Sequence, residues 1–247
     1  MERIYRGVEK FRRDVFPEQR EQFERLAAKK QNPYALFITC SDSRVHPNLF
    51  TQTEPGDIFL LRNAGNLVPA YGASSEGEGA TIEYALAVLG IHHVVVCGHS
   101  HCGAMQGLLH PETACDLPAV SSWFKHAETT RRIVEKRHSN LTGDDLARAA
   151  AQENVLVQIS NLLTHPCVAS RYALGELQIH GWYYEIETGA VLEYSEDEGH
   201  FIDLSEPALP TESAQHPEGA ASTGSPRNAR RGRSVAVGAR PRQSHRR

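Results

Sequence analysis

Long apolar runs are missing from this sequence of 247 residues. No stretch of about 18 apolar residues occurs, so no transmembrane helix and no membrane partner are expected. The first ten residues also lack the apolar core of a secretory signal peptide. Cysteine is scarce: the chain holds five, an odd number without the regular spacing of a disulfide framework. We therefore expect a reduced, cytoplasmic protein rather than a disulfide-stabilised secreted one.

Aromatic residues are absent from residues 205–247, a segment rich in Ser, Ala, Gly, Pro and Arg. The segment holds eight arginines and three acidic residues, a net charge of +5, so the preceding part carries −9 toward the total of −4. With so little apolar surface to bury, it cannot offset the entropy cost of ordering. We predict one globular domain over residues 1–204 and a disordered basic tail over residues 205–247.

A basic tail can attract nucleic acid or an acidic partner. The arginines are not interleaved with aromatic side chains that stack on bases, so we expect no specific nucleic-acid partner. The simpler interpretation is a solvated extension without a fixed target, and composition alone assigns the tail no partner.

Hydrophobic periodicity predicts alternating helices and strands in the rest of the chain. Short apolar runs, typical of buried strands, occupy residues 35–39, 58–63 and 93–97, followed by a pair at 176–180 and 182–194 with a hairpin turn at 187–189. Amphipathic patterns predict helices over residues 2–15, 17–30, 76–89, 103–109, 119–137 and 144–163. This order predicts an α/β fold: a mostly parallel central sheet with helical cover and an N-terminal helical arm.

Polar clusters directly follow two of these strands. Cys40-Ser41-Asp42-Ser43-Arg44 follows the run 35–39, and Gly98-His99-Ser100-His101-Cys102-Gly103 follows the run 93–97. Open α/β sheets place their ligands at the carboxyl ends of parallel strands. We therefore expect the two clusters to meet at one edge of the sheet.

Two cysteines and one histidine at such an edge predict a zinc site. Zinc binds thiolates and imidazoles tetrahedrally, and three protein ligands leave the fourth position free, which is the catalytic pattern. His99 and Cys102 are separated by two residues, so a tight turn can bring both to one metal. We predict that Cys40, His99 and Cys102 hold one Zn²⁺ per chain. His101 is the competing imidazole, and we expect the turn to aim it away.

Asp42 and Arg44 come just after the first predicted ligand. A carboxylate at this place can become a fourth ligand and block the metal, but an arginine within reach can hold it off through a bidentate ion pair. The carboxylate can then accept a hydrogen bond from zinc-bound water and orient the resulting hydroxide toward an electrophile. We predict Asp42 and Arg44 as catalytic residues; the alternative is an ordinary solvated ion pair.

These residues resemble the motifs of the β-class carbonic anhydrases. The motif C-x-D-x-R is present as Cys40, Asp42 and Arg44, and the motif H-x-x-C as His99 and Cys102. The stretches 54–59, 62–68 and 79–85 also resemble segments of that family, and the likeness covers roughly residues 1–200. It is strongest toward the branch found with bacterial carboxysomes, so a carboxysome is the alternative location to the cytoplasm.

The resemblance implies a fold, an activity and an assembly. The fold is a sheet of four parallel strands plus an antiparallel one. The activity is the zinc-dependent reversible hydration of carbon dioxide to bicarbonate and a proton. The assembly is a homodimer, often paired into a tetramer, with N-terminal helices wrapped over the partner.

The resemblance also implies substrate-binding residues. The readily active subtype carries a glutamine before the first strand, which reaches the substrate across the dimer, and Gln31 matches it. The other subtype carries a tryptophan three residues before the first cysteine ligand, where this chain has Phe37. Phe59, Ala64 and Tyr84 match the apolar wall beside the substrate. For these three residues, ordinary core packing is the alternative.

Two other functions stay open at this point. The same scaffold can serve a hydrolase of a carbon dioxide analogue, carbonyl sulfide or carbon disulfide, which assays of both substrates would separate from the anhydrase. A non-enzymatic zinc scaffold in a larger assembly is the third hypothesis. The Asp42–Arg44 pair argues against it, because a structural zinc has no use for a guarded open position.

Overall fold

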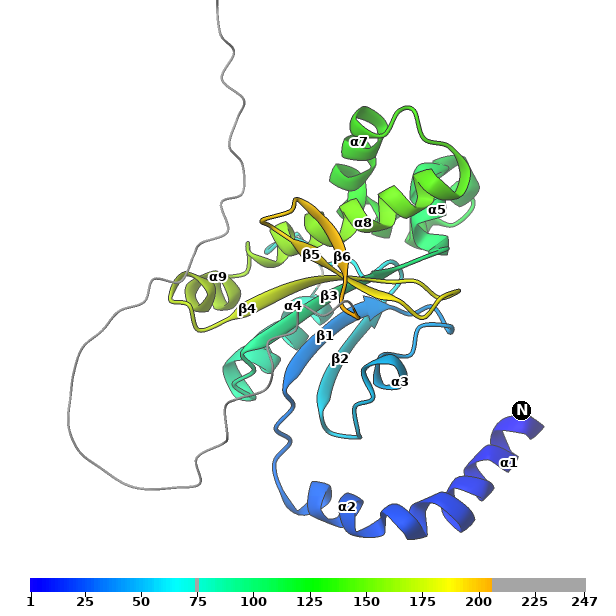
Figure 1. Ribbon diagram of the computed structural model, residues 1–247, viewed down its shortest axis with the longest axis vertical. Coiled ribbons are helices and arrows are strands. Elements are labelled where there is room, and N and C mark those ends of the chain that lie inside the picture. The colour runs from blue at the N-terminus through cyan, green and yellow to red at the C-terminus, as the bar shows by residue number, and fades with distance from the viewer. Residues whose placement is uncertain (74–75, 206–247) are drawn as a thin grey trace, which may run out of the picture.

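A six-stranded sheet forms the centre of the structure, a computed structural model that describes residues 1–73 and 76–205 (Figure 1). The strands are β1 (Ala35–Cys40), β2 (Ile58–Asn63), β3 (His93–His99), β4 (Gln178–Tyr184), β5 (Val191–Ser195) and β6 (His200–Asp203). Their order in the sheet is β2-β1-β3-β4-β5-β6. The first four are parallel, and β5 and β6 are antiparallel to their neighbours. The predicted α/β fold with a mostly parallel sheet is confirmed.

The sheet holds one antiparallel strand more than predicted. β6 pairs with β5 over a register that joins Leu192 to Asp203 and Ser195 to His200. A strand this short shows no clear alternation of apolar and polar residues, so its pairing is visible only in the folded chain. The predicted hairpin lies between β4 and β5, where Gly189 takes a positive φ of 78° that glycine adopts without strain.

Helices cover the sheet and extend from it. They are α1 (Glu2–Lys10), α2 (Phe16–Ala28), α3 (Pro47–Thr51), α4 (Glu76–Glu83), α5 (Gly103–Leu109), α6 (Pro118–Phe124), α7 (Glu128–Arg137), α8 (Gly143–Leu162) and α9 (Pro166–Ala173). Single π-helical turns at Phe11–Val15 and Tyr84–Val88 continue α1 and α4, and 3₁₀ turns lie at Pro111–Ala114 and Lys125–Ala127.

Some helix boundaries differ from the prediction. The predicted helix 119–137 is two helices, because the turn Lys125–Ala127 separates α6 from α7. α3 and α9 were not expected: both are short, and both begin at a proline, which is well suited to the first turn of a helix.

The two faces of the sheet are packed differently. On one face, Ile38 of β1 and Val96 of β3 belong to a core that also contains Ile82 of α4 and Val155 of α8. On the other face, Phe37 packs against Phe50 of α3 and Trp182 of β4, with ring centroids 6.0 and 5.8 Å away. A third apolar cluster lies at the carboxyl ends of the strands and includes Cys40, Cys102, Met105 and Tyr183. This last cluster supports the predicted metal ligands.

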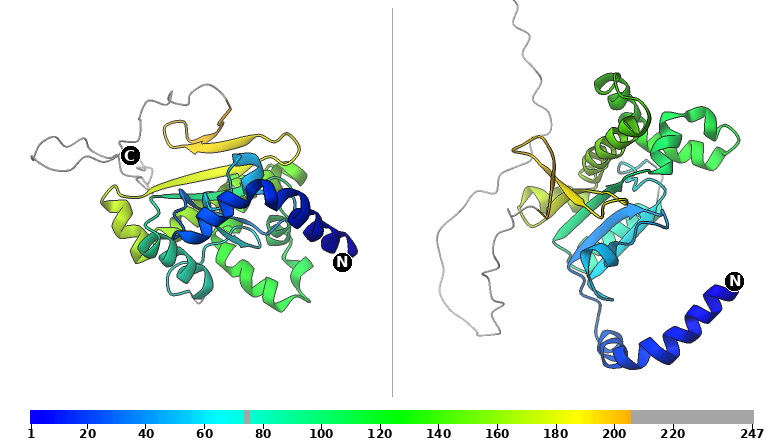
Figure 2. Two further views of the ribbon diagram at one scale, coloured as in Figure 1. Left: turned by 90° about the horizontal axis from the view of Figure 1, so that it is seen from below. Right: turned by 45° about the vertical axis from the view of Figure 1, so that its right-hand side comes forward.

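α1 and α2 form an arm that projects away from the sheet (Figures 1 and 2). No residue of the two helices or of the turn between them is buried. Ile4 and Val8 are 60% and 54% exposed. Phe11, Phe16 and Phe23 pack against one another, with ring centroids 5.7 to 6.2 Å apart. The predicted arm is therefore present, and it displays an apolar surface to solvent.

The structure describes only part of the segments named in the domain prediction. Apart from Ser205, the predicted tail lies outside the described residues, so the boundary between residues 204 and 205 stays a prediction. Among the helices of residues 1–73 and 76–205, none combines the length and the apolar character needed to cross a membrane.

Candidate metal centre

Cys40, His99 and Cys102 form a buried cluster at one edge of the sheet. Cys40 ends β1, His99 ends β3, and Cys102 directly precedes α5. One ligand atom from each residue lies within 4.8 Å of those from the other two. Among the described residues, no other group of three or more His, Cys, Asp or Glu side chains comes this close. The structure thus brings the three predicted ligands together.

The strand register explains why the ligands meet. Thr39 of β1 lies beside Cys97 of β3, and its hydroxyl donates to the Cys97 carbonyl at 3.0 Å, so the two strands end side by side. The backbone after β3 then turns through His101, which takes a left-handed φ of 52°. This turn returns Cys102 to the edge and leaves His101 exposed and outside the ligand cluster.

The imidazole of His99 presents Nε2 as its free acceptor. Its Nδ1 lies 2.8 Å from the carbonyl oxygen of Ser100, and because a carbonyl only accepts, Nδ1 carries the proton. Nε2 is buried without a hydrogen-bond partner. A buried acceptor of this kind is costly, and a metal ion would satisfy it. Together with two sulfurs, this nitrogen makes a donor set that fits zinc.

The two sulfur atoms are arranged for thiolate chemistry. The Gly65 backbone N–H donates to Cys40 Sγ at 3.3 Å. The hydrogen bond from the Cys102 thiol, aided by the Gly65 backbone N–H, lowers the pKa of Cys40, although burial opposes this change. The same hydrogen bond and burial raise the pKa of Cys102. The pair therefore favours a thiolate at Cys40, and a bound cation would favour deprotonation of Cys102 as well.

Asp42 and Arg44 form a bidentate ion pair next to Cys40. Arg44 Nε donates to Oδ1 at 3.0 Å, Nη2 donates to Oδ2 at 2.8 Å, and the Arg44 backbone N–H donates to Oδ1 at 2.9 Å. The hydrogen bonds from the Arg44 side chain hold the pKa of Asp42 well below its usual range, against the effect of burial. The side chain of Asp42 is 17% exposed and that of Arg44 is 49% exposed. The carboxylate is thus largely enclosed, while the guanidinium reaches solvent.

Arg62 holds the backbone around the first ligand, a role that sequence reasoning does not reveal. Its Nε donates to the Cys40 carbonyl at 3.0 Å, and its Nη2 donates to the carbonyls of Asp42 and Val45 at 2.8 and 2.9 Å. These bonds tie the end of β2 to the loop that follows β1. In the sequence, Arg62 stands out as a charged residue at the end of an otherwise apolar strand pattern, which was a detectable sign of such a role.

Two buried polar residues of α8 hold the loop that donates to Cys40. Asn154 Nδ2 donates to the Gly65 carbonyl at 3.0 Å, and Gln158 Oε1 accepts from the Val68 backbone N–H at 2.8 Å. Gln158 Nε2 also donates to Asn154 Oδ1 at 2.9 Å. Their spacing of four places both on one helix face among apolar residues, which was a detectable sign of a buried network.

Ala64 and Gln31 occupy different places relative to the ligands. Ala64 directly precedes Gly65 in the loop beside Cys40, and its carbonyl accepts from Trp123 Nε1 at 2.8 Å. Gln31 is exposed on the segment between α2 and β1. Among the described contacts, none joins Gln31 to the ligand cluster. Only Ala64 of this pair therefore lies by the metal ligands of its own chain.

Phe59 and Tyr84 pack against each other, with ring centroids 6.1 Å apart. Phe59 lies near the start of β2, beside Leu36, whereas Cys40 lies beside the last residue of β2. The separation of four residues corresponds to about 13 Å along the strand. Tyr84 is 43% exposed, so the two rings are not simply core residues. They form an apolar patch that is displaced from the metal ligands of the same chain.

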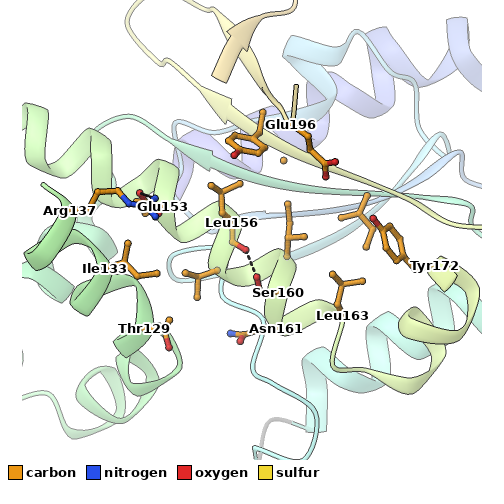
Figure 3. A pocket seen from close by; sticks show the side chains of 15 residues that line it. Thr129, Ile133, Arg137, Glu153, Leu156, Ser160, Asn161, Leu163, Tyr172 and Glu196 are labelled. Atoms are coloured by element: carbon orange, nitrogen blue, oxygen red, sulfur yellow. Dashed lines mark hydrogen bonds and ion pairs between the residues drawn. The ribbon is translucent and has the colours of Figure 1, made fainter. Parts of the chain in front are cut away.

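A cavity of about 680 Å³ opens elsewhere, between α7, α8 and strands β4 and β5 (Figure 3). Arg137 and Glu153 pair at one side of it, and Tyr172 lies at the other (Figure 3). None of the predicted site residues lines this cavity. The candidate site of catalysis is therefore the ligand cluster and not this cavity.

Known proteins share both the sequence and the fold. Residues 35–191 match the family model described as carbonic anhydrase. A carbonic anhydrase from Synechocystis is 52% identical over 195 residues, which cover 78% of this chain and 71% of that protein. The solved structure of the β-carbonic anhydrase CcaA is 50% identical with a TM-score of 0.80, covering 82% of this chain and 98% of that chain. A structure of tetrameric β-carbonic anhydrases from Sordaria macrospora is 30% identical with a TM-score of 0.64, covering 78% and 92%.

Proposed function

The chain belongs to the β-carbonic anhydrase family, and from this premise we propose that it hydrates carbon dioxide to bicarbonate and a proton at a zinc ion held by Cys40, His99 and Cys102. One observation carries the proposal. Three ligand atoms of the type that zinc prefers lie within 4.8 Å of one another in a buried place. Bound zinc would supply a Lewis acid that makes water nucleophilic near neutral pH.

The three predicted ligands would bind the metal through different atoms. Cys40 and Cys102 would hold the metal as thiolates, and His99 would hold it through Nε2 while its Nδ1–H stays on the Ser100 carbonyl. Three protein ligands are the number typical of a catalytic rather than a structural zinc site.

Asp42 orients the attacking water. Its carboxylate is ionised because Arg44 lowers its pKa, and it is kept off the metal because Arg44 occupies both oxygens. Oδ1 already accepts two hydrogen bonds from Arg44, whereas Oδ2 accepts one and retains a lone pair for a hydrogen bond from the water. The water gives up its other proton to solvent, and this hydrogen bond holds the proton that remains, so that a lone pair faces the carbon atom of the substrate.

The active unit in this proposal is a homodimer, which can pair further into a tetramer. The apolar side chains of the arm are exposed in a single chain, and packing against a second copy would remove them from water. Gln31, Phe59 and Tyr84 lie away from the ligands of their own chain, so they serve the site of the partner. The Sordaria enzymes, which share the fold, are tetrameric. Location in the cytoplasm or in a carboxysome, and any partner of the tail, stay predictions.

Carbon dioxide hydration by the purified full chain, followed with a pH indicator in a stopped-flow instrument, tests the proposal together with zinc content. We expect one zinc per chain and rapid hydration. A zinc-loaded chain that hydrates no carbon dioxide but hydrolyses carbonyl sulfide or carbon disulfide would favour the hydrolase. A zinc-loaded chain without either activity would favour the scaffold.

A further inference from the structure

The turn between β4 and β5 contacts Ser100, which lies between His99 and Cys102. Ser100 is the point of attachment. Its backbone N–H donates to the Tyr184 carbonyl at 2.9 Å, which extends the pairing of β3 with β4. Its hydroxyl accepts from the Ile186 backbone N–H at 2.9 Å and donates to the Glu187 carboxylate at 2.6 Å. One hydrogen bond therefore joins Ser100 to the end of β4, and two join it to the turn.

The same serine orients His99. Its carbonyl accepts the Nδ1–H of His99 at 2.8 Å. In metal sites, the partner of the second imidazole nitrogen fixes both the tautomer and the direction of the ring. A shift of Ser100 would move this carbonyl and would turn Nε2 away from the two sulfurs.

Glu187 makes the shortest of the three attachments to Ser100. The hydrogen bond from the Ser100 hydroxyl lowers the pKa of Glu187, so its carboxylate is ionised at neutral pH and the bond is charge-assisted. Its other oxygen lies 3.3 Å from His101 Nε2. Arg44 Nη2 also donates to the His101 carbonyl at 3.0 Å. Glu187 and Arg44 thus both hold this loop.

We propose that Glu187, acting through Ser100, is a positioning residue for the zinc ligand His99. The inference rests on the zinc site of the proposed function. It gives the β4–β5 turn, which lies far from the ligands in sequence, a part in metal binding. The side chain of Glu187 is 52% exposed, so its replacement removes a surface contact and leaves the core intact.

Competition between the zinc-loaded full chain and a chromophoric chelator tests the inference. Glu187→Ala is expected to raise the zinc dissociation constant about tenfold. Glu187→Gln keeps an oxygen that accepts from Ser100, and it should recover most of that loss. The visible absorption of the Co²⁺-substituted chain should shift in Glu187→Ala, because the His99 ring turns. A double-mutant cycle completes the test: on a Ser100→Ala background, Glu187→Ala should change the constant less than about twofold.

Glu185→Gln is the matched control. Glu185 lies in the same turn, but its carboxylate pairs with Arg148 of α8. Its variant should bind zinc within about twofold of the wild type, because the described contacts of this carboxylate are with Arg148 and Thr188 and not with Ser100 or His99. Equal losses in both variants, or an unchanged constant in Glu187→Ala, would overturn the inference and leave the proposed function standing. A wild-type chain that binds no zinc would overturn both.

Discussion

Arg44 binds both carboxylate oxygens of Asp42, with Nε 3.0 Å from Oδ1 and Nη2 2.8 Å from Oδ2. The pair directly follows Cys40, so the carboxylate is close enough to the ligands to act on the reacting water or to compete for the metal. In the proposed mechanism, Arg44 decides between these two roles of the carboxylate. The two residues therefore call for separate variants with different expected results.

Asp42→Ala should keep zinc and lose most turnover. The variant leaves Cys40, His99 and Cys102 in place, so the zinc content should stay at one per chain. Loss of the group that orients the water should lower kcat about 100-fold. Zinc analysis and stopped-flow hydration rates measure the two quantities. Turnover near that of the wild type would remove Asp42 from the mechanism.

Arg44→Ala should close the site. Without the guanidinium, the Asp42 carboxylate is free to become a fourth ligand, so activity should fall while zinc stays bound. Arg44→Lys is the informative companion, because a single ammonium cannot bind both oxygens in the same plane and should restore activity only in part. A crystal structure of zinc-loaded Arg44→Ala checks the cause. If Asp42 were still off the metal there, the gating role would be refuted.

Cys102→Ala should remove zinc and activity together, since the two remaining ligands make a poor site. Cys97→Ala is the matched control. Cys97 is also buried on β3, but it lies outside the ligand cluster, and burial raises the pKa of its thiol to about 12. It should keep one zinc per chain. Full zinc and full turnover in Cys102→Ala would show that the ligand assignment is wrong.

The cluster of predicted metal ligands could be inferred because Cys40 and His99 each closely follow an apolar run. Cys40 and His99 each sit at the last position of a strand, and the register of two neighbouring strands then decides where they meet. The apolar runs before them are enough to infer both strands. Likewise, Asp42 and Arg44 are two residues apart, so their pairing needs no information about distant parts of the chain.

Contacts between distant segments were not predictable in the same way. Glu187 reaches Ser100 across 87 positions, and Asn154 reaches Gly65 across 89 positions. No periodicity in the sequence encodes such pairs, because they depend on how the hairpin and α8 pack. The patch of Phe59 and Tyr84 illustrates the same point. Its residue types suit a substrate wall, but only the strand register shows that it is displaced from the ligands of its own chain.

Stability should fall as the pH is lowered, through Glu193 and His93. His180 Nδ1 lies 2.8 Å from Glu193 Oε1, and this hydrogen bond lowers the pKa of Glu193 from its usual 4.5. Because the folded pKa is below the unfolded one, the stability from Glu193 is present above pH 4.5 and is lost as the pH falls through the folded value. Burial lowers the pKa of His93 from 6.5, so the unfolded chain takes up this proton first and stability falls below pH 6.5 as well.

Thermal unfolding between about pH 8 and pH 3.5 measures this dependence. Glu193→Gln should lower the free energy of unfolding by about 1 kcal/mol at neutral pH, where the carboxylate is ionised. The cost should shrink toward zero at the acid end, where the wild-type carboxyl also becomes protonated. A cost that is the same at both ends of the range would show that packing, and not the charge of Glu193, is responsible.

Mixing two inactive variants should restore activity if Gln31 serves the site of the partner. Gln31 lies between the arm and β1, where none of its described contacts reaches the ligands of its own chain. A heterodimer of Gln31→Ala and Cys102→Ala keeps one complete site, built from the metal of the first chain and the glutamine of the second. With random pairing, about a quarter of all sites should be active. Asp42→Ala mixed with Cys102→Ala is the control, since both of its sites lack a residue of their own chain and no recovery is expected. Subunit exchange is verified by mass. If the first mixture exchanged subunits and stayed as inactive as the control, Gln31 would act within its own chain or not at all.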